Sequence, residues 1–578
     1  MPIASPAGPG RAPGPFDWIA AGANRFTVWR ARRRASPMWT VVVALILAPL
    51  LLPIATVAWL ALSPADDALL HLVRTILPGT LRDTLLLLVG VGATTLVVGT
   101  GTAWIVTMYR FTGRNVLDRL LVIPLAVPTY IVAYAWTDIL DTGGPVQSAV
   151  RTLGGWTSAR DYWFPEVRSI GGAVLVLSSV LYPYVYLSAR ASFVQQSVCA
   201  LEVARTLGRT PLGAFWSVAL PMARPALAAW LALALMETLN DLGASQHLGV
   251  RTLSATIYST WQQRSNLPGA AQIAAVLLAI VVALFAAERL ARGRAQFHHT
   301  TSRYRAIPFA DLTGLKAFLA AVCCLVPFAV GFAIPAAMLT ANAIGHLDDS
   351  ASGGFWRAAA SSFGLAIVAA GVATALGVVL AYARRVAANG FTRPAVSLAG
   401  LGYALPGTVL ALGLLLPLAA FDNWIDGLAR ATLGISTGLL VSGTLALLVL
   451  AYVVRFLAVS LGTVEAGLER ISPNLDAAAR TLGETALSTL WRVHLPMLMP
   501  ALGTAALLVF VDVMKELPAT LLLRPFNFES LATHVYALAA LEQIEAASVG
   551  ALAIVLVGLV PVLLLHRTIA GGRTGHRY

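Results

Sequence analysis

Apolar residues recur along this chain in twelve runs that are separated by short polar segments. A helix that spans a bilayer needs about 20 consecutive apolar residues. Runs of that length lie near 39–62, 82–108, 117–138, 169–189, 225–247, 270–288, 314–340, 358–383, 395–419, 433–457, 499–523 and 545–566. The pattern predicts an all-α polytopic membrane protein with about 12 transmembrane helices.

Composition and charge agree with a chain embedded in a lipid bilayer. Hydrophobic residues make up 58% and charged residues only 12% of it, against about 25% charged residues in soluble proteins. The net charge of +13 comes from arginines in short segments beside the apolar runs, which argues against a nucleic-acid partner. Arg30 and Arg32–Arg34 precede the first run and Arg567 and Arg573 follow the last one, so the positive-inside rule predicts that both termini lie in the cytoplasm.

A basic linker at 289–313 divides the predicted spans into two sets of six. Six is an even number, so each set returns to the cytoplasm, and the halves 39–288 and 314–568 are predicted to be parallel repeats. We expect 1–38 to be a disordered cytoplasmic segment and 569–578 to be a cytoplasmic tail.

One polar sequence segment occurs in both halves. Ala204–Gly208 reads ARTLG and returns 275 residues later as Ala479–Gly483, and 15 of the 24 positions from Ala204 to Leu227 are identical at that offset. The pattern predicts a short helix that ends at a left-handed glycine, and a second helix that starts at Pro211. A Leu-Pro pair is then expected to break the chain before it enters the membrane.

These two segments resemble the EAA loop of the permeases of binding-protein-dependent ABC importers. The resemblance implies a multi-pass protein of the bacterial inner membrane with the type I ABC importer permease fold, in which each loop forms a coupling helix that sits in a cleft of the cytoplasmic ATPase. It assigns ATPase coupling to Glu202, Ala204, Arg205, Gly208, Leu220, Pro221, Asp476, Ala479, Arg480, Gly483, Leu495 and Pro496. The second copy departs from the pattern, because Ala477 replaces the acidic residue and Asp476 stands one position earlier.

The chain itself lacks the signature of an ATPase. Its only lysines, Lys316 and Lys515, stand outside any G-x-x-x-x-G-K-[ST] loop. No catalytic constellation is found, and the three cysteines show neither a disulfide framework nor a metal-ligand spacing. We therefore expect no cofactor and no metal site on this chain. The resemblance implies that ATP is hydrolysed by partner ATPase subunits, which we expect to form a homodimer.

Charged residues also occur at membrane depth. Glu237, Asn240 and Asp241 stand at i, i+3 and i+4, and Asp512, Lys515 and Glu516 repeat the spacing. Each charge near the bilayer centre costs at least about 2.5 kcal/mol, so we expect these side chains to line the translocation pathway or a gate. A purely structural role is the alternative, with Lys515 paired to Asp512 or Glu516 and Asn240 bound to a neighbouring backbone.

The substrate is suggested only by resemblance. Stretches that begin at Pro124, Tyr162 and Val513 look like the fused two-domain permeases of ferric-iron importers, to which a periplasmic binding protein delivers Fe(III). Thiamine, polyamine, sulfate or phosphonate permeases of the same class remain alternatives. A different class, the ion-coupled secondary transporters, would use Glu237 and Asp241 to carry the coupling ion. The aromatic loop at 139–168 would either receive the binding protein or anchor the chain at the lipid interface.

Overall fold

The computed structural model describes residues 37–61, 74–195, 206, 208–292, 310–346, 353–387 and 389–571. Within them, 11 helices are long and apolar enough to cross a membrane, or 12 if one bent pair is counted as a single span. The predicted all-α, multi-span fold is confirmed.

The first repeat begins with α2 and ends with α14. Its elements are α2 (Pro37–Ala61), α4 (Leu77–Met108), β1 (Tyr109–Arg110), α5 (Arg114–Leu120), the 3-10 helix η1 (Ile123–Ala126), α6 (Thr129–Leu140), α7 (Pro145–Gly154), α8 (Ile170–Gln195), α10 (Pro211–Ala214), the π-helix η2 (Phe215–Ala219), α11 (Leu220–Asn240), α12 (Gly243–His247), α13 (Leu253–Gln262) and α14 (Leu267–Arg292).

The second repeat begins with β2 and ends with α27. Its elements are β2 (Ala310–Asp311), α15 (Gly314–Phe328), the π-helix η3 (Ala329–Ala333), α16 (Ile334–Gly345), α18 (Gly353–Val386), α19 (Thr392–Ala399), the 3-10 helix η4 (Gly400–Ala404), α20 (Gly407–Leu433), α21 (Leu445–Glu469), α22 (Pro473–Thr481), α23 (Ala486–Thr489), the π-helix η5 (Leu490–His494), α24 (Leu495–Met514), α25 (Pro518–Leu523), α26 (Leu531–Ala540) and α27 (Ile544–Gly571). The strands β1 and β2 pair in parallel over two residues each.

The predicted span at 117–138 is bent. The helical segments Arg114–Ala126 and Thr129–Gly154 meet at an angle of 98°. Pro128 lies at the bend with extended backbone angles and caps α6. Since a proline disfavours helical geometry in the residue before it, the break follows directly from the sequence Val127-Pro128.

The predicted span at 433–457 is displaced. In the structure α20 continues to Leu433 and ends at Gly434, whose φ of +69° lies in the left-handed region, and α21 starts only at Leu445. The intervening segment itself contains leucine, valine and isoleucine, so hydrophobicity alone placed the helix start at 433, 12 residues before Leu445.

The expected break at each Leu-Pro pair is wrong. The helices run without interruption over Phe215–Asn240 and Ala486–Met514, so Pro221 and Pro496 lie inside continuous helices. In both repeats a π-helical turn, η2 or η5, comes directly before the Leu-Pro pair. The longer hydrogen-bond spacing of a π-turn accommodates a residue that has no N–H and whose ring would clash in a regular α-helix.

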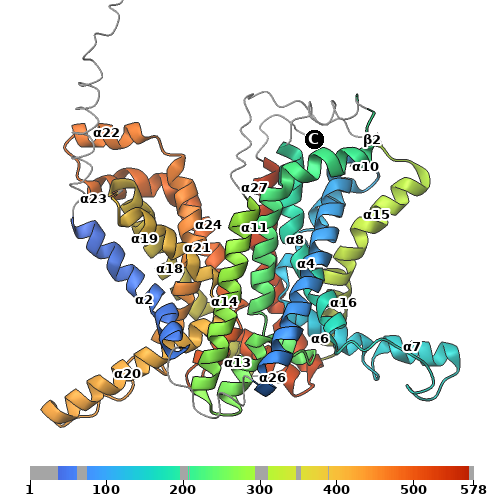
Figure 1. The fold of residues 1–578 in the computed structure, drawn as a ribbon, viewed down its shortest axis with the longest axis horizontal. Coiled ribbons are helices and arrows are strands. Elements are labelled where there is room, and N and C mark those ends of the chain that lie inside the picture. Colours follow the sequence, from blue (N-terminus) through green and yellow to red (C-terminus); the bar gives the residue numbers. More distant parts are fainter. Residues whose placement is uncertain are drawn as a thin grey trace, which may run out of the picture. The chain divides into compact units, whose positions relative to one another are not determined.

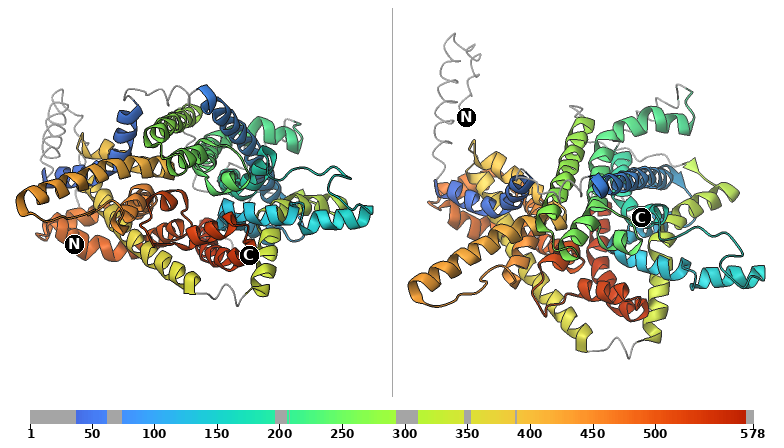
Figure 2. Two further views of the ribbon diagram at one scale, coloured as in Figure 1. Left: turned by 90° about the horizontal axis from the view of Figure 1, so that it is seen from below. Right: turned by 60° about the horizontal axis from the view of Figure 1, so that its bottom comes forward.

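The chain forms two compact units. Within the described residues, unit 1 comprises 37–50, 374–387, 389–402 and 457–505, and unit 2 comprises 51–61, 74–195, 206, 208–292, 310–346, 353–373, 403–456 and 506–571. In unit 2, α8 packs against α4 and α11, and α14 packs against α11 and α13 (Figures 1 and 2). A Cβ at Gly99 of α4 would lie 2.8 Å from the Cβ of Val185 and 2.9 Å from the backbone N of Tyr186, so only glycine allows this close approach of α8.

Candidate functional site: a polar cavity and two coupling segments

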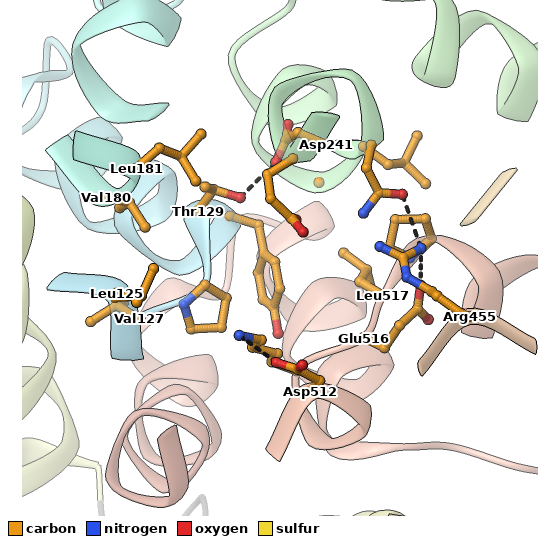
Figure 3. Close-up of a pocket in the computed structure, with 18 of the residues that line it drawn as sticks. Leu125, Val127, Thr129, Val180, Leu181, Asp241, Arg455, Asp512, Glu516 and Leu517 are labelled. Atoms are coloured by element: carbon orange, nitrogen blue, oxygen red, sulfur yellow. Dashed lines mark hydrogen bonds and ion pairs between the residues drawn. The ribbon is translucent and has the colours of Figure 1, made fainter. Parts of the chain in front are cut away.

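Unit 2 contains a cavity of about 110 Å³ that is lined by both polar and apolar side chains. Helices of both repeats contribute to its wall (Figure 3). Its lining includes all six residues of the predicted pathway, together with Thr129, Tyr130, Val180, Tyr184, Tyr403, Arg455 and Leu517. The tertiary structure therefore brings the two intramembrane triads together around one space.

Two of the six residues, Asp241 and Glu516, accept hydrogen bonds from backbone N–H groups. Asp241 accepts hydrogen bonds from the backbone N–H and hydroxyl of Ser245, at 2.8 and 2.9 Å, and from the hydroxyl of Thr129 at 2.6 Å. Glu516 accepts hydrogen bonds from the backbone N–H groups of Ala519 and Thr520, both at 3.1 Å. Each carboxylate thus satisfies orphan N–H groups at the start of a short helix, α12 or α25, where negative charge is favoured.

Asn240, the middle residue of the first triad, forms hydrogen bonds with residues of the second repeat. The side-chain oxygen of Asn240 accepts a hydrogen bond from the backbone N–H of Gly407 at 2.7 Å and one from Arg455 Nη1 at 3.0 Å. Arg455 Nη1 also lies 3.3 Å from Glu516 Oε1, and the side chains of this ion pair are only 6% and 2% exposed. The structural alternative for Asn240, a bond to a neighbouring backbone, is therefore present in the structure.

The remaining residues face the cavity with fewer partners. Glu237 Oε1 accepts a hydrogen bond from the hydroxyl of Tyr403 at 2.8 Å. Lys515 Nζ lies 2.9 Å from Asp512 Oδ1, as the structural alternative for this pair proposed. Their exposed fractions of 31% and 18% show that the pair lies at the cavity rather than inside helix packing.

Arg455 is the residue that sequence reasoning missed. It interrupts the apolar run Val453-Val454-Arg455-Phe456-Leu457 in α21, and a lone arginine inside a span is itself a functional signal. At the offset of 275 its counterpart is the apolar Val180, so the two repeats differ at this point of the cavity. No sequence pattern indicated Tyr403 as a site residue, because its hydrogen-bond partner Glu237 lies 166 residues away.

The second predicted coupling segment, residues 473–489 of unit 1, has the predicted form of a helix, a glycine turn and a second helix. Ser472 caps α22, which ends at Thr481, and Gly483 follows with a φ of +82°. Thr485 then caps α23 through the backbone N–H of Ser488. The hydroxyl of Ser488 and the guanidinium of Arg492 hold the pKa of Glu484 below its usual value.

Asp476 is bound within the chain. Arg385 of α18 donates two hydrogen bonds to Asp476 Oδ2, at 3.0 and 2.5 Å, and others to the backbone carbonyls of Leu468 and Ile471. His494 Nε2 lies 3.2 Å from Asp476 Oδ1 in a fully buried position. Through its bonds to Arg385, Asp476 therefore links α22 to α18.

In the first copy, Gly208 has a φ of +79°, and α10 begins at Pro211, both as predicted. Glu202, Ala204 and Arg205 lie outside the described residues. Leu220 and Pro221 are the first residues of α11, as Leu495 and Pro496 are of α24. Ala479 is buried on α22, whereas Arg480 is exposed.

Comparison with known families decides what kind of protein this is. The family described as the inner membrane component of binding-protein-dependent transport systems matches residues 95–296 and again residues 373–572. The chain belongs to this family. It carries the family domain twice, as the resemblance of the two coupling segments predicted, and it is a multi-pass membrane permease.

Individual relatives within the family differ in how much of the chain they match. The Fe(3+)-transport system permease protein FbpB 2 of Haemophilus influenzae is 25% identical over 92% of this chain and 99% of its own length. A putative 2-aminoethylphosphonate transport system permease protein, PhnU of Salmonella paratyphi A, is 29% identical over 37% of this chain and 75% of its own length. The sulfate transport system permease protein CysT of Escherichia coli is 28% identical over 31% of this chain and 62% of its own length.

Proposed function

We propose that this chain, which carries two permease domains, is the permease of an ABC importer that carries ferric iron across a bacterial inner membrane into the cytoplasm. A periplasmic binding protein would deliver the iron, and both termini would lie in the cytoplasm. The assignment of iron as the substrate rests on the extent of the match. The iron permease aligns over 92% of this chain, whereas the phosphonate and sulfate permeases align over 37% and 31%.

Coupling to ATP would use the two helix–glycine–helix segments. A homodimer of cytoplasmic ATPase subunits offers two equivalent clefts, and the chain offers two segments whose glycines, Gly208 and Gly483, share a left-handed conformation. ATP would bind only to those partner subunits and would close them, drawing the segments together and turning the cavity outward. Such a cycle requires that the ATPase bind the two permease conformations with different affinities.

Proteoliposomes test this function. The purified chain, reconstituted with the ATPase subunits that co-purify with it, should accumulate radiolabelled iron from a ferric-loaded binding protein only when ATP is present on the ATPase side. Orthovanadate should stop the uptake. Uptake driven by a proton or sodium gradient without ATP would overturn the proposal in favour of a secondary transporter.

Substrate choice is tested in the same vesicles. Unlabelled ferric binding protein should compete with the labelled form, whereas sulfate, 2-aminoethylphosphonate, thiamine and spermidine, each with its own binding protein, should not be accumulated. ATP-driven accumulation of one of these solutes in place of iron would retain the importer and reject the iron assignment.

A further inference from the structure

We propose that Tyr130, Tyr134 and His247 form the outer gate of the cavity in unit 2, and that the solute enters from the periplasm when α6 and α12 part at these three side chains. The inference rests on the proposed function as an importer, and it assigns a role in solute entry to residues outside the two triads.

The rings of the outer gate are in contact from the cavity to the end of α12. Tyr130 lines the cavity, and the centroid of its ring lies 5.8 Å from that of Tyr134, one turn further along α6. The Tyr134 ring meets the imidazole of His247, the last residue of α12, edge to face with the centroids 4.6 Å apart. Tyr130 and Tyr134 are only 4% and 2% exposed, so their rings block this side of the cavity.

The two helices that carry the outer gate pack together and lead away from the cavity. Both begin at the cavity wall, where Thr129 and Gly243 line it. A Cβ at Gly243 would lie 2.7 Å from the Cβ of Tyr130, so α12 approaches α6 closely at this point. Beyond the end of α6, Asp141 forms an ion pair of 3.3 Å with Arg168, and both side chains are 44% exposed. The outer gate therefore lies between the cavity and an exposed, charged end of unit 2.

This end of unit 2 lies opposite the first predicted coupling segment. Asn240 is the last of the 21 residues of α11, so the cavity lies about 30 Å along that helix from the end that follows α10. Figure 1 shows α10 at one end of α8 and α11, and α6 and α7 at the other. Since the coupling segments are proposed to face the cytoplasm, the outer gate lies on the periplasmic side of the cavity.

Three buried polar atoms of the outer gate have no partner. They are the hydroxyls of Tyr130 and Tyr134 and Nε2 of His247, none of which is hydrogen-bonded within the described part of the chain. Such atoms are rare and costly in folded proteins. When α6 and α12 part, water or the solute can bind all three atoms, which offsets the loss of the ring contacts. This lowers the cost of opening, as a gate that opens and closes in every cycle requires.

The second repeat shows how the same helices pack without a gate of this kind. There α20 packs against α25 as α6 packs against α12. Counted from the prolines that cap α6 and α20, and at the offset of 275 for α12, the counterparts of the three gate residues are Thr408, Leu412 and Leu522. Leucine packs helices together without burying a polar atom. Packing alone therefore does not account for two tyrosines and a histidine in the first repeat.

Thiol labelling from the periplasmic side tests the outer gate in right-side-out membrane vesicles that contain the chain and its ATPase subunits. Val180→Cys places a thiol on the cavity wall (Figure 3), in a chain whose three native cysteines are replaced by alanine. A membrane-impermeant thiol reagent should label this thiol slowly while the gate is closed. ATP with orthovanadate inside the vesicles should accelerate the labelling, because the cavity then turns outward.

Removing the rings should open the outer gate without ATP. Tyr134→Ala deletes both ring contacts, so labelling should accelerate by about tenfold or more, the equivalent of about 1.4 kcal/mol. His247→Ala deletes one contact and should act in the same direction. Leu412→Ala is the matched control, because it removes a buried side chain at the equivalent position of the second repeat and should leave the labelling rate unchanged.

Tyr134→Phe separates a gate from a packing role. It keeps the ring but removes a buried hydroxyl that gains a partner only in the open state. Labelling without ATP should therefore stay at or below the wild-type rate, whereas labelling with ATP and orthovanadate should slow severalfold. A side chain that only packs α6 against α12 would leave both rates unchanged.

Wild-type labelling rates in Tyr134→Ala and His247→Ala, in chains that insert and bind the ATPase normally, would overturn the outer gate. Equal acceleration by Leu412→Ala would overturn it as well. If Tyr134→Ala does not fold, Tyr134→Phe decides, because an unchanged rate with ATP and orthovanadate would also reject the gate.

Iron uptake separates this inference from the proposed function, since the labelling needs no iron. Iron import by the wild type, together with wild-type labelling of the gate variants, would reject the outer gate and leave the importer standing. Accelerated labelling of the gate variants in a chain that imports a different solute would retain the gate and reject the iron assignment.

Discussion

Asp241 and Glu516 stand 275 residues apart at equivalent positions of the two repeats, and each carboxylate binds the backbone N–H groups of the short helix that follows it. The intramembrane charges of this permease therefore divide into two sets. The last position of each triad binds backbone N–H groups, whereas Glu237 and Asp512, at the first position, bind the side chains of Tyr403 and Lys515.

Glu516→Ala should destabilise the chain strongly. The change removes three acceptor bonds at the start of α25 and leaves Arg455 as a buried cation with one partner fewer. Breaking one side of a buried ion pair costs about 3–5 kcal/mol, and the loss can be measured by unfolding in mixed micelles. Glu166→Gln, at an exposed carboxylate, is the matched control. A Glu516→Ala chain as stable as that control would show that the carboxylate does not hold α25.

The bond between Asn240 and Arg455 should appear as an energetic coupling between the repeats. Asn240→Leu and Arg455→Met each remove one side of a contact of 3.0 Å. In a double-mutant cycle on the free energy of unfolding, contacting residues couple by about 0.5–3 kcal/mol. Arg455→Met combined with Glu166→Gln should be additive, since those residues share no contact. If the effects of Asn240→Leu and Arg455→Met on the free energy of unfolding were additive, this hydrogen bond would not couple the two repeats.

The glycine turns should matter for coupling to the ATPase. Valine at Gly483, where φ is +82°, would be strained by about 1–2 kcal/mol and would tilt α22 relative to α23. The permease should still insert and fold, but its stimulation of the ATPase should fall, and Gly208→Val should act likewise. Gly503→Ala on α24, where an added Cβ meets nothing within 4 Å, is the control. Full ATPase stimulation by both valine variants would contradict a coupling role for the turns.

Asp476→Asn should loosen α22 within unit 1. The two hydrogen bonds that Arg385 donates to Asp476 would lose their ionic character. Hydrogen bonds to charged groups contribute about 1.5–3 kcal/mol, so amide exchange in 473–481 should accelerate roughly 30-fold, the equivalent of about 2 kcal/mol. Glu469→Gln, at an exposed carboxylate on neighbouring α21, should leave exchange in α22 unchanged. If amide exchange in 473–481 were unchanged in Asp476→Asn, the hydrogen bonds between Arg385 and Asp476 would not be what holds α22 in place.

The sequence predicted the spans and the repeat because lipid offers no hydrogen bonds to the backbone, so a long apolar run has few alternatives to a helix. The glycine turns were predictable for a similarly local reason, since few residues other than glycine adopt a positive φ without strain. The prediction failed where the deciding interaction is finer than hydrophobicity, as at the late start of α21 and at the π-turns that carry the helices through Pro221 and Pro496.

The sequence alone also placed the two triads within apolar runs, although it left Arg455 unnoticed, and the spacing i, i+3, i+4 places Glu237, Asn240 and Asp241 on one face of a helix. Only the tertiary structure decided what each one does. The partners of Asp241 and Glu516 are backbone groups that become available only when the chain bends into α12 and α25. Arg455 meets Asn240 from 215 positions away in sequence. Burial and proximity, rather than residue type, divide these charges into fixed supports and groups open to the cavity.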